Sequence, residues 1–188
     1  MTIRSTFAAS FLSLMALSAC AQNAPRSEVA LDYTYVHTNA PPGGCGCFPM
    51  NGGSGSFAYR FKPALAVVAD FGAVHAGNVD STGLDLTLTT FLFGPRYSHP
   101  IAKTRFTPFA QVLIGAVHAS GGLAPSKTIS ASSSTAFAAT VGGGLDYKLT
   151  HHIIIRPAQV EYFVTMLPNQ ADGHQNNLRI NSGLVLRF

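Results

Sequence analysis

LRINSGLVLRF, residues 178–188, is the stretch that decides the fold. Its large apolar side chains fall at alternate positions: Leu178, Ile180, Leu184, Leu186 and Phe188. The positions between them are mostly polar or small: Arg179, Asn181, Gly183 and Arg187. Because successive side chains of a β-strand point to opposite faces, this pattern predicts a strand with one apolar and one polar face. The stretch is also about as long as a tilted strand that crosses a bilayer.

The composition agrees with a protein whose outer surface meets lipid. Hydrophobic residues make up 47% of the chain and charged residues only 11%, about half the charged fraction of an ordinary soluble domain. No segment after the amino-terminal leader approaches 18 consecutive apolar residues, so a membrane-spanning helix is not expected. The net charge of +4 is spread along the chain without a run of Lys or Arg. Nucleic acid is therefore not an expected partner.

Residues 1–21 have the pattern of a secretory signal peptide. Arg4 supplies the positive charge, Phe7 to Leu17 form a short apolar core, and small residues follow. Ala19-Cys20-Ala21 fits a small-x-small cleavage site, whereas the four residues that end at Cys20 fit a lipoprotein signal that would acylate this cysteine. Both alternatives stay open. In either case we expect a single domain over residues 22–188.

Seven more stretches of the chain predict strands, with or without clean alternation. They begin at Glu28 and then cover Gly55–Lys62, Leu65–Ala76, Leu84–Tyr97, about Arg105–Ala119, Ser134–Leu149 and Ile153–Met166. In the fourth stretch Leu84, Leu86 and Leu88 alternate with Asp85, Thr87 and Thr89, and a change of phase at Phe91–Phe93 predicts a bulge. A second bulge is expected near Pro157. The facing of Arg105–Ala119 stays open.

The connections between these strands alternate in length. Pro- and Gly-rich or Ser-rich stretches predict long loops at Asn39–Gly53, Gly77–Gly83, Ser120–Ser133 and Leu167–Gln175. Short turns are expected at Pro63-Ala64, Ser98–Thr104 and Thr150–His152. Eight strands with this alternation predict an all-β fold, an eight-stranded antiparallel up-and-down transmembrane β-barrel. A soluble barrel would carry its apolar residues inside and its polar residues outside, which is the reverse of this pattern.

The polar faces of the strands supply charges to the interior. On the inward parity lie the predicted lumen charges: Asp32, Arg60, Asp70, Arg96, Asp146, Arg156, Glu161, Arg179 and Arg187. Eight strands leave an interior that side chains can just fill, and a buried charge without a partner is costly. We therefore expect a cross-barrel network of ion pairs and trapped water that blocks the lumen.

Three motifs in this order resemble one known family. They are Gly94-Pro95-Arg96-Tyr97, Gly142-Gly143-Gly144-Leu145-Asp146-Tyr147 and the terminal Leu186-Arg187-Phe188. The chain resembles the outer membrane protein A-type family of small eight-stranded barrels over nearly its whole length after the leader. The resemblance implies a bacterial outer-membrane location, lipid as a partner, and a terminal strand, with Leu184, Leu186 and Phe188, that the barrel-assembly machinery recognises. The best-known relatives carry a peptidoglycan-binding domain after the barrel, and this sequence stops at Phe188, so cell-wall anchoring is not expected.

Aromatic and metal-ligating residues allow further hypotheses. The aromatic residues expected near strand ends form interfacial girdles: Tyr35, Tyr59, Phe61, Tyr97, Phe106, Tyr147 and Phe188. Cys45 and Cys47 could form a strained disulfide or, with histidines of the external rim, a metal site. Those rim histidines are His37, His75, His118 and His174, whereas His99, His151 and His152 fall in the short turns. We predict no metal, no cofactor and no enzymatic site, although a rim histidine with Ser81 or Ser120 is a conceivable catalytic pair.

Three functions remain possible from the sequence. The first is an integral outer-membrane barrel with a structural or surface-interaction role and a filled, charged lumen. The second is a narrow pore for ions or small solutes. The third is a soluble or lipid-anchored periplasmic barrel that binds an apolar ligand.

Overall fold

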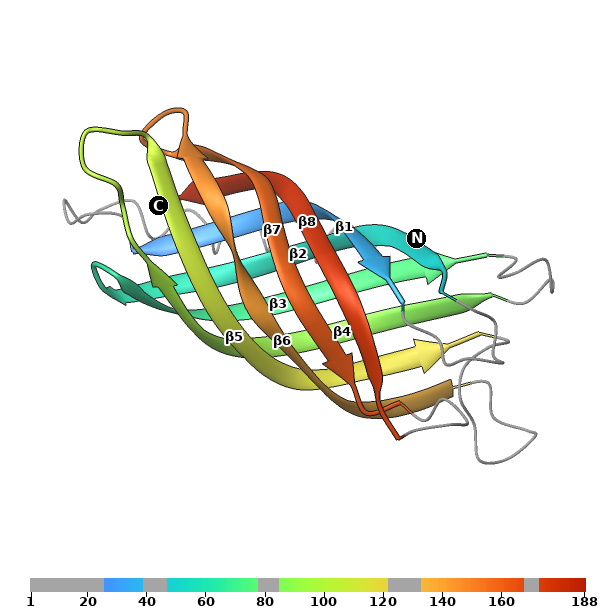
Figure 1. The fold of residues 1–188 in the computed structure, drawn as a ribbon. Coiled ribbons are helices and arrows are strands. Elements are labelled where there is room, and N and C mark those ends of the chain that lie inside the picture. Colours follow the sequence, from blue (N-terminus) through green and yellow to red (C-terminus); the bar gives the residue numbers. More distant parts are fainter. Residues whose placement is uncertain (1–25, 39–46, 78–84, 122–132, 168–172) are drawn as a thin grey trace, which may run out of the picture.

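The computed structural model describes residues 26–38, 47–77, 85–121, 133–167 and 173–188 (Figure 1). They form eight strands: β1 (Ser27–His37), β2 (Pro49–Lys62), β3 (Leu65–Ala76), β4 (Leu86–Ser98), β5 (Phe106–Ser120), β6 (Ser133–Lys148), β7 (Ile153–Thr165) and β8 (Gln175–Arg187). Each strand is antiparallel to the next, and β1 also pairs with β8, so the sheet closes on itself. The predicted eight-stranded up-and-down barrel is confirmed. Within the described ranges, no helix has the length and apolarity needed to cross a membrane.

The two ends of the barrel differ in their connections (Figure 1). The short turns after β2, β4 and β6 lie at the same end as Ser27 and Phe188, whose backbone groups exchange two hydrogen bonds of 3.2 and 2.8 Å. Strands β1, β3, β5 and β7 end at the other end, and the segments of sequence that follow them are longer. Transmembrane barrels keep their short turns in the periplasm and their long loops outside. We therefore name these ends the periplasmic end and the external end.

β2 begins earlier than the sequence predicted. The expected loop Asn39–Gly53 ends in fact before Pro49, and Gly52 and Gly53 pair with Thr34 and Tyr33 of β1. Gly52 is therefore a strand residue. The strand needs glycine at this position, because a Cβ atom on Gly52 would meet the carbonyl oxygen of Ala73 on β3 at 1.9 Å. Glycine inside a strand commonly marks such a close backbone approach.

One predicted bulge is confirmed and the other is wrong. The pairing of β7 with β8 shifts register between Arg156 and Gln159, around the expected position at Pro157, so both side chains face inward. β4 instead pairs with β3 without interruption from Leu86 to Tyr97. The leucines of this strand point inward and the two phenylalanines Phe91 and Phe93 point outward. The apparent change of phase at 91–93 arises because both faces of β4 are apolar here.

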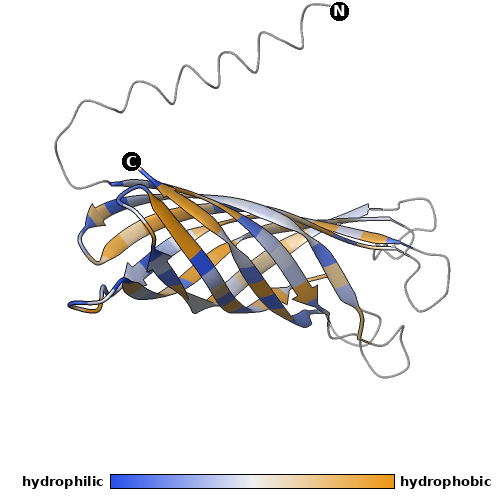
Figure 2. Cartoon of the chain, turned by 90° about the horizontal axis from the view of Figure 1, so that it is seen from above, coloured by the Kyte–Doolittle hydropathy of each residue, from blue (hydrophilic) through white to orange (hydrophobic). Residues whose placement is uncertain are grey.

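The outer surface of the barrel is apolar along the strands. Leu31, Phe71 and Phe91 are each more than half exposed, and Figure 2 shows hydrophobic and hydrophilic residues alternating along the strands. Strands β1, β3 and β8 face as predicted, with Asp32, Asp70 and Arg179 inside. A water-soluble barrel does not expose an apolar belt of this extent, which excludes the third hypothesis, a soluble ligand-binding barrel.

Candidate functional site: the lumen and the two ends of the barrel

The lumen begins at the periplasmic end with one carboxylate held by two arginines. Glu28 of β1 accepts hydrogen bonds at Oε1 from Arg60 of β2 and from Arg187 of β8, whose Nη2 lies 2.7 Å away. The two arginine side chains keep 17 and 19% of their surface exposed. Glu28 was missed in the sequence, although it shares the inward parity of Asp32. This group is the solvated mouth of the lumen.

The next layer is centred on Arg156 of β7, which is fully buried. Its Nε and Nη2 donate to the two carboxylate oxygens of Asp146 on β6, at 2.8 and 3.2 Å. Its Nη1 lies 3.6 Å from Oδ2 of Asp32 on β1. A guanidinium that binds one carboxylate with two nitrogens is held in a fixed orientation. Arg156 thus ties three strands together across the lumen.

A chain of hydrogen bonds and one longer ion pair crosses the middle of the lumen. Arg96 Nε donates to Oε1 of Gln111 at 2.8 Å, and Gln111 Nε2 donates to Oε1 of Glu161 at 2.8 Å. The other oxygen of Glu161 lies 3.7 Å from Nη1 of Arg179, whose Nη2 donates to Oδ1 of Asp70 at 2.8 Å. This chain joins β4, β5, β7, β8 and β3. Within the described ranges, Arg96 has no carboxylate at ion-pair distance, so Gln111 connects it to the network.

Phe109 of β5 connects the two buried groups of charges. The guanidinium carbons of Arg96 and Arg156 each lie 4.6 Å from the centroid of its ring. The face of an aromatic ring attracts cations, so this one ring stabilises both guanidinium groups. The sequence left the facing of this strand open, and neither Phe109 nor Gln111 was assigned to the lumen.

The interior charges balance. All nine predicted lumen charges face inward, and with Glu28 they make five arginines and five carboxylates. The ion pairs and the Gln111 bridge satisfy most of their polar atoms. Asp32 Oδ1, Gln159 Oε1 and Asn181 Oδ1 are buried without a hydrogen-bond partner within the described ranges. The trapped water expected from the sequence stays a prediction.

The external half of the lumen contains a large apolar cluster beside a few buried polar residues, Thr38, Thr140, Thr165 and Asn177, and the sequence did not predict this cluster. We call the following buried side chains the apolar half: Val36, Met50, Val74, Leu86, Leu88, Leu92, Leu113, Val117, Phe163 and Leu167. They approach the external loops, since Val36 pairs with Met50 near the end of β1. Leu86 and Leu88 were expected on the apolar, outward side of β4. Instead Thr87 and Thr89 face outward there.

Aromatic residues surround the outside of the barrel. Towards the periplasmic end, Tyr59, Phe61, Tyr97, Phe106 and Phe188 expose two fifths or more of their surface, and Tyr147 packs on Phe106 with 5.0 Å between ring centroids. Towards the external end, the hydroxyls of Tyr33 and Tyr162 donate to the side-chain oxygens of Asn51 and Asn176. Tyr35 also faces outward on β1. Apolar rings with a polar tip suit the two membrane interfaces.

The external rim carries two histidine–threonine pairs. His75 Nδ1 lies 3.0 Å from Oγ1 of Thr87, and His118 Nδ1 lies 2.8 Å from Oγ1 of Thr135. His37 and His174 are also exposed at this end. No group of three or more His, Cys, Asp or Glu within the described ranges could hold a metal ion. Cys45 and Ser81, and the whole of residues 1–25 with the predicted signal peptide and Cys20, lie outside the described residues.

The histidines of the short turns lie at the periplasmic end, as their positions in the sequence predicted. The rings of His151 and His152 contact each other with 5.0 Å between centroids. His152 Nδ1 lies 3.0 Å from the backbone oxygen of Arg187, and the backbone N–H of His99 donates to the oxygen of Pro108. These contacts hold the turns against neighbouring strands.

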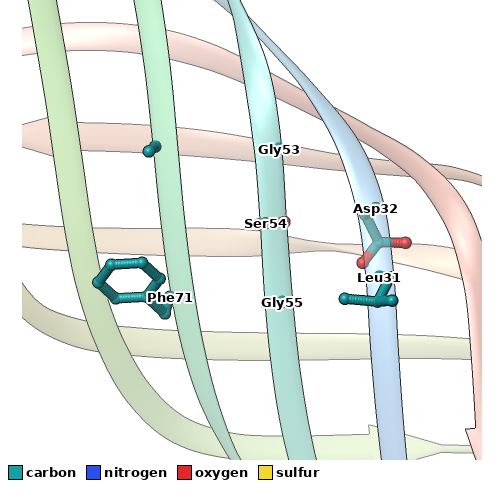
Figure 3. A pocket seen from close by; sticks show the side chains of 7 residues that line it. Leu31, Asp32, Gly53, Ser54, Gly55 and Phe71 are labelled. Carbon is teal, nitrogen blue, oxygen red and sulfur yellow. The ribbon is translucent and has the colours of Figure 1, made fainter. Parts of the chain in front are cut away.

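A shallow depression lies on the outer surface over β2 (Figure 3). Leu31 of β1 and Phe71 of β3 stand on either side, and Gly53 and Gly55 lie between them. Its lining is mostly apolar, because the side chain of Asp32 behind it points into the lumen. This apolar depression supplies no polar group for the recognition of a ligand. In a membrane, lipid hydrocarbon fills such a depression.

Comparison with known proteins agrees with this geometry. Residues 7–188 match the family described as "Outer membrane protein beta-barrel domain". The chain belongs to this outer membrane β-barrel family. It is accordingly an integral protein of the bacterial outer membrane, as predicted, and the resemblance to small eight-stranded outer-membrane barrels is confirmed. A search of curated proteins finds no match.

Solved structures show the same fold at low sequence identity. Neisserial surface protein A is 15% identical, with a TM-score of 0.68 over 86% of this chain and 97% of that one. Ail, the attachment invasion locus protein of Yersinia pestis, is 14% identical, with a TM-score of 0.58 over 88% of this chain and 100% of that one. OprG from Pseudomonas aeruginosa is 14% identical, with a TM-score of 0.54 over 88% and 96%. At this identity the likeness of these outer-membrane barrels concerns the fold.

Proposed function

We propose that this outer-membrane barrel is a closed, non-conducting scaffold that presents its external loops for surface interactions. The observation that carries the proposal is the filled lumen. Arg156, Glu161 and Arg179 are at most 2% exposed in the charged half, and Leu88, Leu113 and Phe163 at most 1% in the apolar half. An ion that crossed the barrel would have to break the ion pairs and then enter an apolar layer. Both steps oppose conduction.

Planar bilayer recordings test the closed lumen. The purified full chain should show no steady current, whereas a porin inserted under the same conditions serves as the positive control. A large, stable single-channel current from the unaltered protein would support the second hypothesis, a narrow pore. Barrel closure itself is checked on a gel, where the folded protein should migrate differently before and after boiling, because a closed sheet has no edge from which to unzip.

The surface-interaction role is supported by the architecture and by the names of similar structures. One neighbour is described as a surface protein and another as an attachment invasion locus protein, which was also crystallised with the heparin analogue sucrose octasulfate. Cell adhesion by bacteria that display the intact barrel, compared with a variant lacking residues 122–132, tests whether the external loops carry the interaction.

We also propose that the protein has no catalytic role. The described rim histidines His75 and His118 hydrogen-bond threonines, and neither geometry includes a third group that orients the ring for base catalysis. Phospholipid and lipopolysaccharide recovered after incubation with the purified barrel should be chemically unchanged. Release of a fatty acid, abolished by His118→Ala, would show an enzyme.

The terminal strand is proposed as the signal for the barrel-assembly machinery. Leu184, Leu186 and Phe188 face outward along β8 and are 52, 42 and 50% exposed. Removal of Phe188 should lower the amount of inserted protein more than Tyr147→Ala, because β8 must be recognised and must then pair with β1. Equal surface levels of the two variants would contradict the assignment.

A further inference from the structure

The exposed charges of the barrel are divided between its ends. The described Lys and Arg residues that are exposed all lie at the periplasmic end: Arg26, Lys62, Lys103, Arg105 and Lys148. The exposed acidic residue within the described ranges is Asp85, at the external end. The lumen adds no net charge, because its five arginines and five carboxylates balance. The periplasmic end is therefore a surface of uncompensated positive charge.

Three of these cations stand next to aromatic residues of the outer surface. The neighbours in the chain are Phe61-Lys62, Arg105-Phe106 and Tyr147-Lys148. Phe61 and Phe106 are 53 and 41% exposed on the outside of the barrel. Because such aromatic residues mark the membrane interface, the cation one residue nearer the strand end lies at the level of the lipid headgroups.

Lys103, Arg105 and Lys148 are gathered where β5 meets β6. The backbone N–H of Lys148 donates to the oxygen of Arg105 at 2.9 Å. The turn before β5 is closed by the N–H of Ile101, which donates to the oxygen of Phe106 at 3.1 Å and places Lys103 within the turn. We call these three cations the basic patch. Backbone positions this close allow the three side chains to approach one anion together.

The backbone of Lys103 is a second observation at this patch. Its φ is 63°, and it is the non-glycine residue with a positive φ within the described ranges. Glycine or asparagine adopts this conformation with less strain than lysine. Backbone strain of this kind collects at functional sites. The turn therefore has a lysine at a position where the positive φ angle alone favours glycine.

We propose that the basic patch binds the phosphate headgroup of an anionic phospholipid in the periplasmic leaflet of the outer membrane. The guanidinium of Arg105 matches two phosphate oxygens, and the two ammonium groups add positive charge beside it. The Phe106–Tyr147 pair lies next to the patch on the lipid-facing side, where the lipid's glycerol and acyl chains continue from the headgroup. This adjacency to the aromatic belt favours a membrane lipid over the cell wall.

Native mass spectrometry of the folded full chain tests the proposal. The protein is released from micelles that contain equal amounts of phosphatidylglycerol and phosphatidylethanolamine, and the ratio of the two bound lipids is measured. The unaltered protein should retain mainly phosphatidylglycerol. In the double variant R105Q/K148Q the ratio should fall by about tenfold, since each cation near an anionic surface contributes about a fivefold preference before screening.

The matched control removes two cations elsewhere at the same end. R26Q/K62Q has the same net charge as R105Q/K148Q and should lower the ratio by at most about fivefold, because only Lys62 of this pair stands beside an exposed aromatic residue. R105K/K148R exchanges the two cations and should also keep most of the preference. All variants must retain the gel shift of the folded barrel, which separates loss of binding from loss of folding.

Several outcomes would overturn the proposal. They are equal retention of the two lipids by the unaltered protein, an unchanged ratio in R105Q/K148Q, or an equal fall in both double variants. Sedimentation of the unaltered barrel with purified peptidoglycan, lost in R105Q/K148Q while the lipid ratio stays constant, would identify the cell wall as the occupant instead. None of these results bears on whether the lumen conducts.

Discussion

The two halves of the lumen fill the same narrow barrel by different means. In the charged half, Arg156 and Glu161 are buried because several strands supply each of them with partners. In the apolar half, Leu113 and Phe163 are buried because their volumes pack together. Loss of one member leaves an unpaired charge in the first half but only a cavity in the second. The stability of the charged half therefore depends on complete pairing of its charges, and that of the apolar half depends on packing.

The largest expected effect is that of Arg156→Leu in the charged half. The substitution leaves Asp146 and Asp32 buried without their shared cation, and loss of one partner of a buried ion pair costs about 3–5 kcal/mol. The free energy of unfolding should fall by this amount in urea titrations of the detergent-solubilised barrel, followed by the gel shift. Arg156→Lys keeps the charge and should lose less.

A second substitution sharpens this test. Adding Asp146→Leu to Arg156→Leu removes the more closely bound carboxylate and should restore part of the lost stability, because replacing both partners is less costly than removing one. If the double variant is less stable than Arg156→Leu alone, the loss comes from packing around Phe109 rather than from the unpaired charge. The charged half would then resemble the apolar half.

Leu113→Ala in the apolar half should lower the free energy of unfolding by roughly 3 kcal/mol, because the surrounding side chains relax only partly into the space. The ion-pair network of the charged half stays intact, so no current is expected in planar bilayers. Leu31→Ala is the matched control. Its side chain faces lipid and is 68% exposed on the barrel surface, so the same truncation leaves no cavity and should cost less. Equal losses for the two variants would show that the apolar half is loosely packed.

The two halves should also differ in how much each one blocks ion conduction, although this effect is smaller. Glu161→Gln removes one charge from the middle of the network and leaves Arg179 with Asp70. We expect only brief, small currents, since the apolar half stays closed to ions. Adding Leu113→Ser to Glu161→Gln should make these currents more frequent. Steady currents from Glu161→Gln alone would mean that the ion pairs, and not the apolar half, close the lumen.

The same contrast explains what the sequence could predict. Strict alternation predicted the facing of β1, β3 and β8, because apolar residues outside contrast with charges inside. It failed for β4, where Leu88 inside and Phe91 outside are both apolar. The partners of the charges could not be predicted either. Arg179 and Asp70 are 109 positions apart in the chain, and only the closed register of the barrel brings them together.

The smallest effect is expected at the periplasmic mouth, where Arg60→Gln removes one of the two cations that hold Glu28. Arg187 remains 2.7 Å from the same carboxylate oxygen, so no charge is left unpaired. Arg60 is also partly exposed, and pairs in contact with solvent contribute about 0–1 kcal/mol. The loss should shrink further when unfolding is measured in 1 M salt, where screening acts within about 3 Å. A loss as large as that of Arg156→Leu, unchanged by salt, would show that the mouth is as dry as the centre of the barrel, and the charged half would then have no solvated boundary.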